Sequence, residues 1–439
     1  MFQRMLALFR VFAAGLLFAG GYFHAHAQEA STQPPLTLTL QDALARAKTN
    51  SVQFQSALTE QGLAHQDNVQ ARAVLLPSVN YNTTYIYTEG NGTPTGIFLA
   101  NNGVHEYLSQ GDVHQVVGYS QFADYRRARA LDAVARAKSE IAARGLVVTV
   151  VQSYYGLVAA QHKYATVEEA ALEAENFLHL SQKLESGGEV ARADVIKAQL
   201  HYQDRQRDLR EAQLTMEKSR LDLAVLLFPN FNENFTVVDD TQLAPPLESF
   251  EEVTRAAEVK NPELRAASAS VQAAGYEVSA ARGSFYPTLT IDYFYGIDAN
   301  HFATRTDGVQ NLGYAATATL NIPIWNWGAN RSKLVQADLK QQQAKRELSL
   351  AQRQLLANMR SVYHEAEAAR AELELLKSSA ELAAESLRLD TLRYQGGEAT
   401  ALEVVDAQNA LTQAQNSFSD GQFRYRLALA NLQTLTGTM

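Results

Sequence analysis

The sequence contains no cysteine among its 439 residues. Without thiols it can form no disulfide framework, no thiolate metal site and no acylated lipobox cysteine. It also lacks the common catalytic signatures: the G-x-x-x-x-G-K-S/T phosphate loop, the G-x-S-x-G nucleophile elbow and the H-E-x-x-H zinc helix. We therefore expect no enzymatic activity, no cofactor and no metal site.

Long apolar runs are scarce, and the clearest one stands at the start of the chain. Arg4 and Arg10 flank the beginning of a run over 11–23, and Ala25-His26-Ala27 supplies the small residues that a signal peptidase needs. We expect residues 1–27 to be a cleaved secretory signal peptide, with an uncleaved membrane anchor as the alternative. Cleavage removes two arginines and moves the formal net charge from −9 to −11, an acidic balance that disfavours nucleic acid as a partner.

The longest later apolar stretch, 145–160, is interrupted by Gln152 and Ser153 and is too short for a transmembrane helix. A secreted chain without a helical span can still enter a membrane through a closed β-barrel, because every backbone group in lipid must find an internal partner.

Proline is absent from two long segments, about 126–184 and 330–394. At 1.5 Å per residue they predict helices on the order of 90 to 100 Å, far longer than globular domains use.

In the closing segment, small and apolar residues recur at the coiled-coil spacing of threes and fours. These residues are Ala407, Ala410, Ala414, Phe418, Gly421, Tyr425, Ala428, Leu432 and Leu435. Leu375, Leu382 and Leu389 form a second seven-residue stripe, and a Gly-Gly turn between the two predicts an antiparallel helical hairpin.

The same order of landmarks occurs twice. The turn at 186–189 precedes Asp194-Val195, and the turn at 395–398 precedes Glu403-Val404-Val405-Asp406. We predict a first structural repeat over 28–229, a linker at 230–249 and a second repeat over 250–439, which form two quasi-equivalent halves. Aligning Tyr125 with Trp327 and Tyr154 with Tyr363 predicts about seven extra residues, one heptad, in the second long helix.

Each repeat contains a pair of strand signals, at about 78–88 and 113–122 and at about 288–298 and 312–324. Apolar and polar residues alternate along them, and Tyr81, Tyr85, Ile291 and Tyr295 share the apolar face. One interpretation is a small antiparallel sheet packed on the helices of a soluble protein. Strand lengths near ten residues, tyrosines and the secretory signal favour a membrane barrel instead, and because barrels need about eight strands, several chains must contribute.

These features together resemble the TolC-like outer-membrane efflux proteins of Gram-negative bacteria, over residues 38–437. The resemblance implies a mostly α-helical fold with a β-barrel portion: a homotrimer with a twelve-stranded barrel in outer-membrane lipid and a long periplasmic coiled-coil tunnel, encircled by a belt to which 230–249 contributes. It implies a passive exit duct for efflux or type I secretion, with a periplasmic adaptor and an inner-membrane pump of the RND or ABC type as partners.

The resemblance also implies site residues. Glu403 and Asp406, with Tyr394 before the turn, match positions at a periplasmic gate. The adaptor would contact the hairpin turns, and the lipid would contact the apolar strand face named above. The residues of the turns are Gly187, Gly188, Glu189 and Asp194, with Gly396 and Gly397 in the second repeat. Glu403 also completes a possible capping box with Thr400, a purely structural role. The competing class of function is a periplasmic coiled-coil scaffold without a pore.

Overall fold

The computed structural model describes residues 36–87, 105–230, 233–240 and 246–436. The predicted signal peptide lies outside them. The chain divides into two units. Among its described residues the smaller one holds 36–37 and 234–236, and there the Leu36 N–H donates to the Asn234 carbonyl over 3.0 Å. Residues 36–37 lie in β1 (Leu36–Leu38) and residues 235–236 in β4 (Phe235–Val237), and these two strands form a two-stranded sheet.

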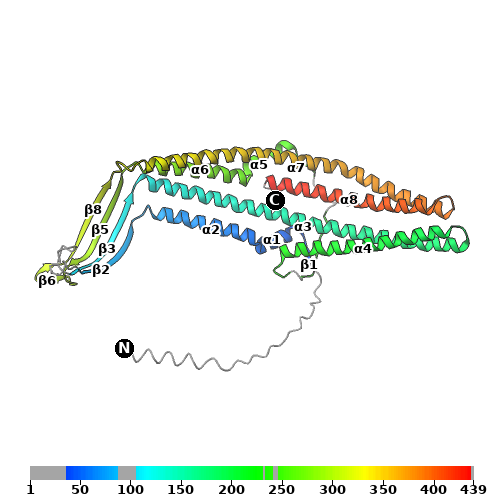
Figure 1. Cartoon of the computed structure of the whole chain (residues 1–439), viewed down its shortest axis with the longest axis horizontal. Coiled ribbons are helices and arrows are strands. Elements are labelled where there is room, and N and C mark those ends of the chain that lie inside the picture. Colours follow the sequence, from blue (N-terminus) through cyan, green and yellow to red (C-terminus); the bar gives the residue numbers. More distant parts are fainter. Residues whose placement is uncertain (1–35, 88–104, 231–232, 241–245, 437–439) are drawn as a thin grey trace, which may run out of the picture. The chain divides into compact units, whose positions relative to one another are not determined.

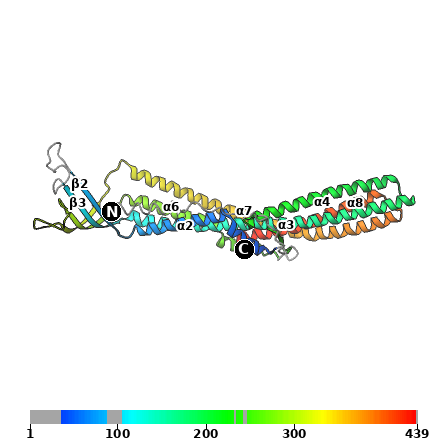
Figure 2. The same ribbon diagram turned by 90° about the horizontal axis from the view of Figure 1, so that it is seen from below.

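Eight described helices follow one order twice (Figure 1). The first set is α1 (Leu40–Asn50), α2 (Val52–Ala73), α3 (Tyr119–Gly187) and α4 (Arg192–Leu227). The second is α5 (Phe250–Lys260), α6 (Pro262–Gly283), α7 (Ala329–Gln395) and α8 (Ala401–Thr436). The two long helices predicted from the absence of proline are therefore present, as are the two hairpins, α3 with α4 and α7 with α8 (Figure 2).

The prediction of an extra heptad is wrong. The long helix α3 has 69 residues and α7 has 67. Tyr125 lies inside α3, whereas Trp327 precedes α7, so these two landmarks are not equivalent. The alignment failed because it matched two aromatic residues that belong to different elements.

Tyr154 and Tyr363, by contrast, occupy matching positions. The Tyr154 hydroxyl lies 3.1 Å from the Leu38 carbonyl oxygen and 2.7 Å from that of Val238, and it accepts from the Val238 N–H. The Tyr363 hydroxyl donates to the Glu248 carbonyl over 3.2 Å. Leu38 and Glu248 each directly precede a residue that starts a helix with a capping box, so each tyrosine fastens the start of a short helix to the middle of a long one.

The predicted stripe on α8 is mostly buried against its neighbours. Gly421 shows how close that packing is, since a Cβ there would lie 2.6 Å from Leu376 Cδ1. The second stripe behaves differently: Leu375, Leu382 and Leu389 are 46 to 68% exposed, and α7 instead turns Leu387 and Tyr394 inward. The heptad pattern thus identifies one face on α8 and one on α7. The chain covers the face on α8 and leaves the face on α7 exposed.

The long helix α3 contains an 18-residue stretch that is long and apolar enough to cross a membrane, judged by length and composition alone. In the structure 44% of that stretch is buried inside the protein. Val150, Val151, Leu157 and Val158 are almost completely covered. We therefore interpret this part of α3 as a core helix, which needs the same apolar residues.

Four strands form one antiparallel sheet in the order β2-β3-β5-β8. They are β2 (Ser78–Tyr87), β3 (His105–Val117), β5 (Thr288–Ala299) and β8 (Leu312–Asn321). A short hairpin of β6 (Arg305–Thr306) and β7 (Val309–Gln310) lies between the last two in sequence. The strands β2 and β8 form the edges, and neither has a partner on its outer side within the described chain.

The two return strands differ from their predicted bounds. The first was predicted at 113–122 but occupies His105–Val117, because 105–111 continue the ladder with β2 and α3 already begins at Tyr119. The second ends at Asn321 instead of 324, two residues before Pro323, which has no N–H to donate to a ladder. Backbone pairing with β2 thus begins eight residues before the predicted start of the first return strand.

Candidate functional site

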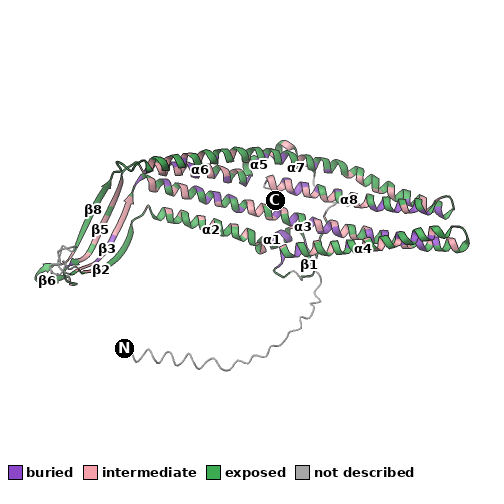
Figure 3. Ribbon diagram, in the orientation of Figure 1, coloured by how far each residue is buried: buried purple, intermediate pink, exposed green. Residues whose placement is uncertain are grey.

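The two faces of the sheet differ in chemistry. Tyr81, Tyr85, Ile291 and Tyr295 lie on one face, as predicted, and are 43 to 72% exposed. Figure 3 shows that most of β2 and β8 is exposed in the single chain. Two tyrosine hydroxyls on this face have hydrogen-bond partners within the sheet. The Tyr81 hydroxyl lies 2.7 Å from Ser109 Oγ, and the Tyr85 hydroxyl lies 2.6 Å from His105 Nδ1.

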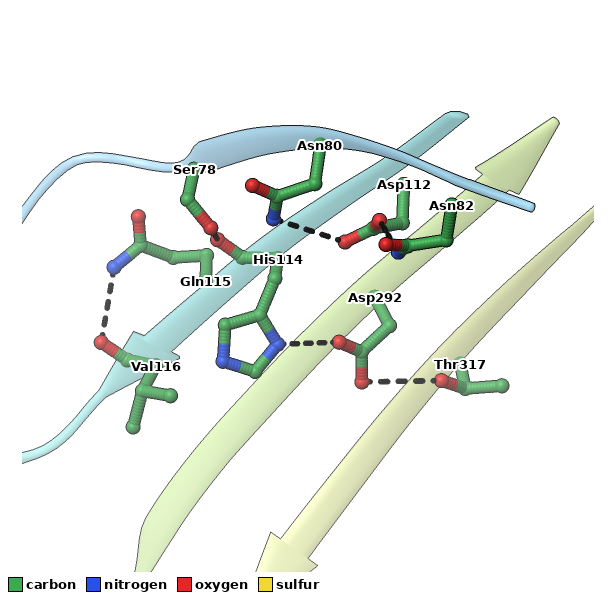
Figure 4. A network of polar contacts seen from close by, with 9 residues as sticks. All are labelled: Ser78, Asn80, Asn82, Asp112, His114, Gln115, Val116, Asp292 and Thr317. Carbon is green, nitrogen blue, oxygen red and sulfur yellow. Dashed lines mark hydrogen bonds and ion pairs between the residues drawn. The ribbon is translucent and has the colours of Figure 1, made fainter. Parts of the chain in front are cut away.

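The opposite face carries a polar network (Figure 4). Asp112 accepts hydrogen bonds from the side-chain amides of Asn80 (3.4 Å) and Asn82 (2.6 Å). His114 and Asp292 join β3 to β5 over 2.5 Å, and Thr317 of β8 donates to the same aspartate over 3.5 Å. Since one face is apolar and exposed while the other is polar and internally bonded, the sheet is suited to separate an apolar medium from an aqueous one.

The two hairpin turns have the same backbone geometry. At the end of α3 the Glu189 N–H donates to the Leu184 carbonyl over 2.9 Å, and at the end of α7 the Glu398 N–H donates to the Arg393 carbonyl over 2.8 Å. Hydrogen bonds from residue i+5 back to residue i are characteristic of the Schellman motif, which needs one residue with a left-handed backbone conformation. Gly188 (φ 79°) and Gly397 (φ 74°) fill that position.

The other glycine of each pair is conformationally ordinary. Gly187 is the last residue of α3, and Gly396 has a φ of −82°. A Cβ on Gly187 would approach only the flexible carboxylate of Glu189, at 3.3 Å. Only Gly188 of the first pair therefore requires the conformational freedom of glycine.

The first-repeat turn and the start of α4 carry the predicted first-repeat contact residues. Glu189 is exposed. Asp194 is partly buried and pairs with Lys197 over 3.5 Å, while Arg192 pairs with Glu185 across the turn over 3.2 Å. This turn therefore presents a mixed pattern of charges in which one carboxylate, Glu189, has no ion pair among the described residues.

The start of α8 is built differently. Glu403 Oε2 accepts from the Thr400 N–H over 3.0 Å, and the Glu403 N–H donates to Thr400 Oγ1 over 3.4 Å, so the predicted capping box is formed. Asp406 lies one turn further along. Both carboxylates are exposed, and the described part of the chain offers Asp406 no hydrogen-bond or ion-pair partner.

Tyr394 has a different environment from the two acids. It is 2% exposed, its hydroxyl donates to Ser181 Oγ over 3.1 Å, and its ring lies 5.1 Å from that of Phe177. Burial raises the pKa of the Tyr394 hydroxyl, which therefore stays neutral. It belongs to a core cluster that joins all four helices of the two hairpins. The cluster comprises Phe177, Leu178, Val195, Ala198, Leu387, Tyr394, Ala401, Val404, Ala407 and Leu411.

A groove of about 680 Å³ beside this cluster was not predicted from the sequence. It lies among α3, α7 and α8, with Phe177, Leu387 and Leu411 in its wall. Burial, together with the neighbouring Glu169, raises the pKa of Glu173 in the same wall. No short sequence motif could have revealed it, because its residues come from three separate helices. Within the described ranges, no group of three histidine or carboxylate side chains is arranged to hold a metal ion.

Comparisons with known proteins agree with this geometry. Residues 253–438 match the model of the family described as outer membrane efflux protein. The chain is 24% identical to the outer membrane protein TolC of Vibrio cholerae over 90% of this chain and 89% of that protein. It is 25% identical to the alkaline protease secretion protein AprF of Pseudomonas aeruginosa, over 92% of this chain and 85% of that one.

Solved structures show the same fold. The outer membrane protein VceC of Vibrio cholerae superposes with a TM-score of 0.80 at 19% identity, covering 91% of this chain and 96% of that chain. Residues 253–438 thus match the outer membrane efflux protein family, and the chain as a whole is similar in sequence to TolC and AprF and in fold to VceC.

Proposed function

We propose that this protein is the outer-membrane channel of a tripartite efflux or type I secretion system, through which substrates leave passively. The observation that carries the proposal is the sheet: four strands of ten to thirteen residues with one exposed apolar face, one polar face and two unpaired edges. The relatives named above support the location and the class of function. The channel supplies no energy of its own, so a pump must drive transport.

The unpaired edges support a closed trimer. An open sheet with ten-residue edge strands exposes a row of backbone donors and acceptors, which lipid cannot satisfy. Pairing β8 of one copy with β2 of the next removes the edges. Three copies would give twelve strands, which is within the range of membrane barrels, whereas four strands from one copy cannot close.

The acids at the start of α8 support a gate. Glu403 and Asp406 are exposed near the turn, and three copies would place rings of carboxylates there. Such rings attract cations and repel one another across a narrow passage. Tyr394 cannot line the same passage within its own chain, because it is buried. In the proposal it instead attaches α7 to α3 through Ser181, and thereby holds the hairpin that carries the acids.

The first-repeat turn is the proposed surface for a periplasmic adaptor, with the second-repeat turn beside it. Both turns complete their backbone hydrogen bonds internally, so a partner can dock without any change in the fold. Glu189 and Asp194 provide the negative charge for docking. The contribution of Asp194 is smaller, because Lys197 already neutralises part of its charge.

Extraction and conductance test the proposed function. The protein should leave outer membranes only with detergent and should conduct ions in planar bilayers. A periplasmic coiled-coil scaffold would be released by osmotic shock without detergent and would form no channel. That result would refute the proposal.

A further inference from the structure

The junction between the sheet and the long helices has an unusual surface. The protein has two tryptophans, Trp325 and Trp327, and both lie in the segment that joins β8 to α7. They are 75% and 89% exposed, with ring centroids 6.0 Å apart. Ile324 beside them is 90% exposed. Exposed side chains of this size are costly in water, so this segment requires a cover.

A small pocket opens on the same junction. It measures about 240 Å³ and lies between the start of α3 and α6. Its wall combines three aromatic rings, Tyr119, Phe122 and Tyr276, with the side chain of Arg126. The Tyr119 ring also contacts Tyr286, just before β5, edge to face at 5.7 Å. Aromatic residues with a polar edge, next to a cation, suit a boundary between apolar and aqueous surroundings.

The junction continues the apolar face of the sheet. The last row of that face is Val117, Leu289 and Leu320, which the strand pairing places side by side. Val117 and Leu320 are 42% and 59% exposed. An apolar band that ends in a belt of tryptophan and tyrosine is the pattern of a membrane protein at the headgroup level.

Positive charge lies immediately beyond this belt. Arg126 is the eighth residue of α3, Arg282 is at the end of α6, and Arg331 is in the first turn of α7. None of the three forms an ion pair or a side-chain hydrogen bond with another residue of the described ranges. Both long helices also begin at this level, at Tyr119 and Ala329, so the positive ends of their dipoles lie here, beside the negative end of α6.

We propose that this junction, defined by Trp325, Trp327, Tyr119, Arg126, Arg282 and Arg331, binds anionic phospholipid headgroups of the membrane leaflet nearest the helices. The inference rests on the proposed membrane insertion of the sheet. The aromatic rings sit among the glycerol and upper acyl atoms, and the arginines donate to headgroup phosphates. Lipid is favoured over a second copy of the chain as the cover because the three arginines have no carboxylate partner among the described residues, and each such cation near an anionic surface strengthens binding about fivefold.

Tryptophan fluorescence provides the test, because both tryptophans lie in the junction. The full-length protein is reconstituted into two vesicle preparations of identical composition, mostly phosphatidylcholine with a minority of phosphatidylglycerol. In one preparation the phosphatidylglycerol carries bromine on its upper acyl carbons, and in the other the phosphatidylcholine does. We expect quenching in both, and several-fold stronger quenching per brominated lipid when phosphatidylglycerol carries the bromine.

The variants Arg126→Gln and Arg331→Gln should each reduce this preference, by up to about fivefold, while quenching by brominated phosphatidylcholine persists. Arg210→Gln, on α4 and exposed, removes the same charge far along the chain from the junction and should retain the preference. Equal quenching by both lipids in the unmodified protein would overturn the headgroup assignment.

Absence of quenching in protein that resists alkaline carbonate extraction would overturn the whole proposal and would indicate that another copy covers the tryptophans. That outcome would leave the channel function intact. Protein that fails to insert into the vesicles at all would count against both the channel and the junction.

Discussion

The sheet and the hairpin turns mark opposite ends of the long helix α3, and they satisfy their polar groups in opposite ways. The turns are complete within one chain: the Schellman bonds at Gly188 and Gly397 and the capping box at Thr400 leave few open backbone groups. The sheet is incomplete in the part of the chain that the structure describes, since there β2 and β8 each have an unpaired side and the apolar face has no cover. Assembly and lipid should therefore matter most for the sheet, whereas the turns should fold alone and be free to bind partners.

The largest expected effect is on the apolar face of the sheet. Arginine in place of Tyr81 or Ile291 should cost about 2–4 kcal/mol in the membrane and reduce the assembled oligomer, because the charge would face hydrocarbon. Arginine in place of Asn82 or Thr290, on the polar face, should be tolerated. At position 82 the new guanidinium can still pair with Asp112. The fraction of oligomer on semi-native gels measures the difference, and equal tolerance on both faces would contradict the assignment of the lipid-facing side.

The next effect concerns the left-handed glycines of the turns. Gly188→Val and Gly397→Val should each cost about 1–3 kcal/mol of local stability, because a β-branched residue is strained at positive φ. Gly187→Ala is the matched control and should be nearly neutral. With Gly188→Val we expect an inserted oligomer that no longer supports efflux or cross-links to the adaptor. A variant that still cross-links and exports would locate the docking surface elsewhere.

A smaller effect on stability, but a visible one on conduction, is expected at the start of α8. Glu403→Ala removes the capping box and should destabilise the helix by about 1 kcal/mol, while Asp406→Ala should change stability little. Together they should raise single-channel conductance and weaken block by divalent cations, since the carboxylate rings are lost. The measurements separate the two roles. If Glu403→Ala lowers stability but the double variant leaves conductance unchanged, Glu403 acts only as a helix cap and the gate assignment is wrong.

The smallest effect on stability is expected at Asp194. Asp194→Arg loses the pair with Lys197, a partly exposed interaction worth under about 1 kcal/mol. Charge reversal should nevertheless weaken cross-linking to the adaptor, and an arginine-to-aspartate change on the adaptor tip should restore it. Lys197→Gln breaks the same ion pair and is the control: if it weakens cross-linking as much as Asp194→Arg does, the charge of Asp194 is not recognised.

The helices and the repeated order of elements could be predicted because their signals are local and long. Absence of proline and the two Gly-Gly turns act within a few positions, and the bounds of α7 and the end of α3 follow from them, whereas the start of α3 at Tyr119 was predicted as strand. The alternation along β2 and β5 was equally readable. The first half of β3 was missed because its sequence resembles a loop, and it becomes a strand only through pairing with β2.

The sequence allowed us to predict which residue types form the site, but not the surroundings of each residue in the fold. The sequence indicated the acids near the second turn, and the capping of Glu403 followed from spacing alone. It gave no indication that Tyr394 is buried against Phe177 and Ser181, since those residues lie more than two hundred positions away in the chain. The groove beside them and the exposed tryptophans at the junction likewise depend on contacts between distant helices and strands.

Closure of the sheet by neighbouring copies is the central claim, and the absence of native cysteine makes it directly measurable. A cysteine at Thr83 of β2 is combined in turn with one at Tyr314, Ala316 or Ala318 of β8, all on the same face, and the membrane-inserted protein is oxidised. We predict that at least one pair yields a ladder of one, two and three linked chains that ends at three. No linked product from any pair, or a ladder that continues beyond three, would contradict the trimeric barrel.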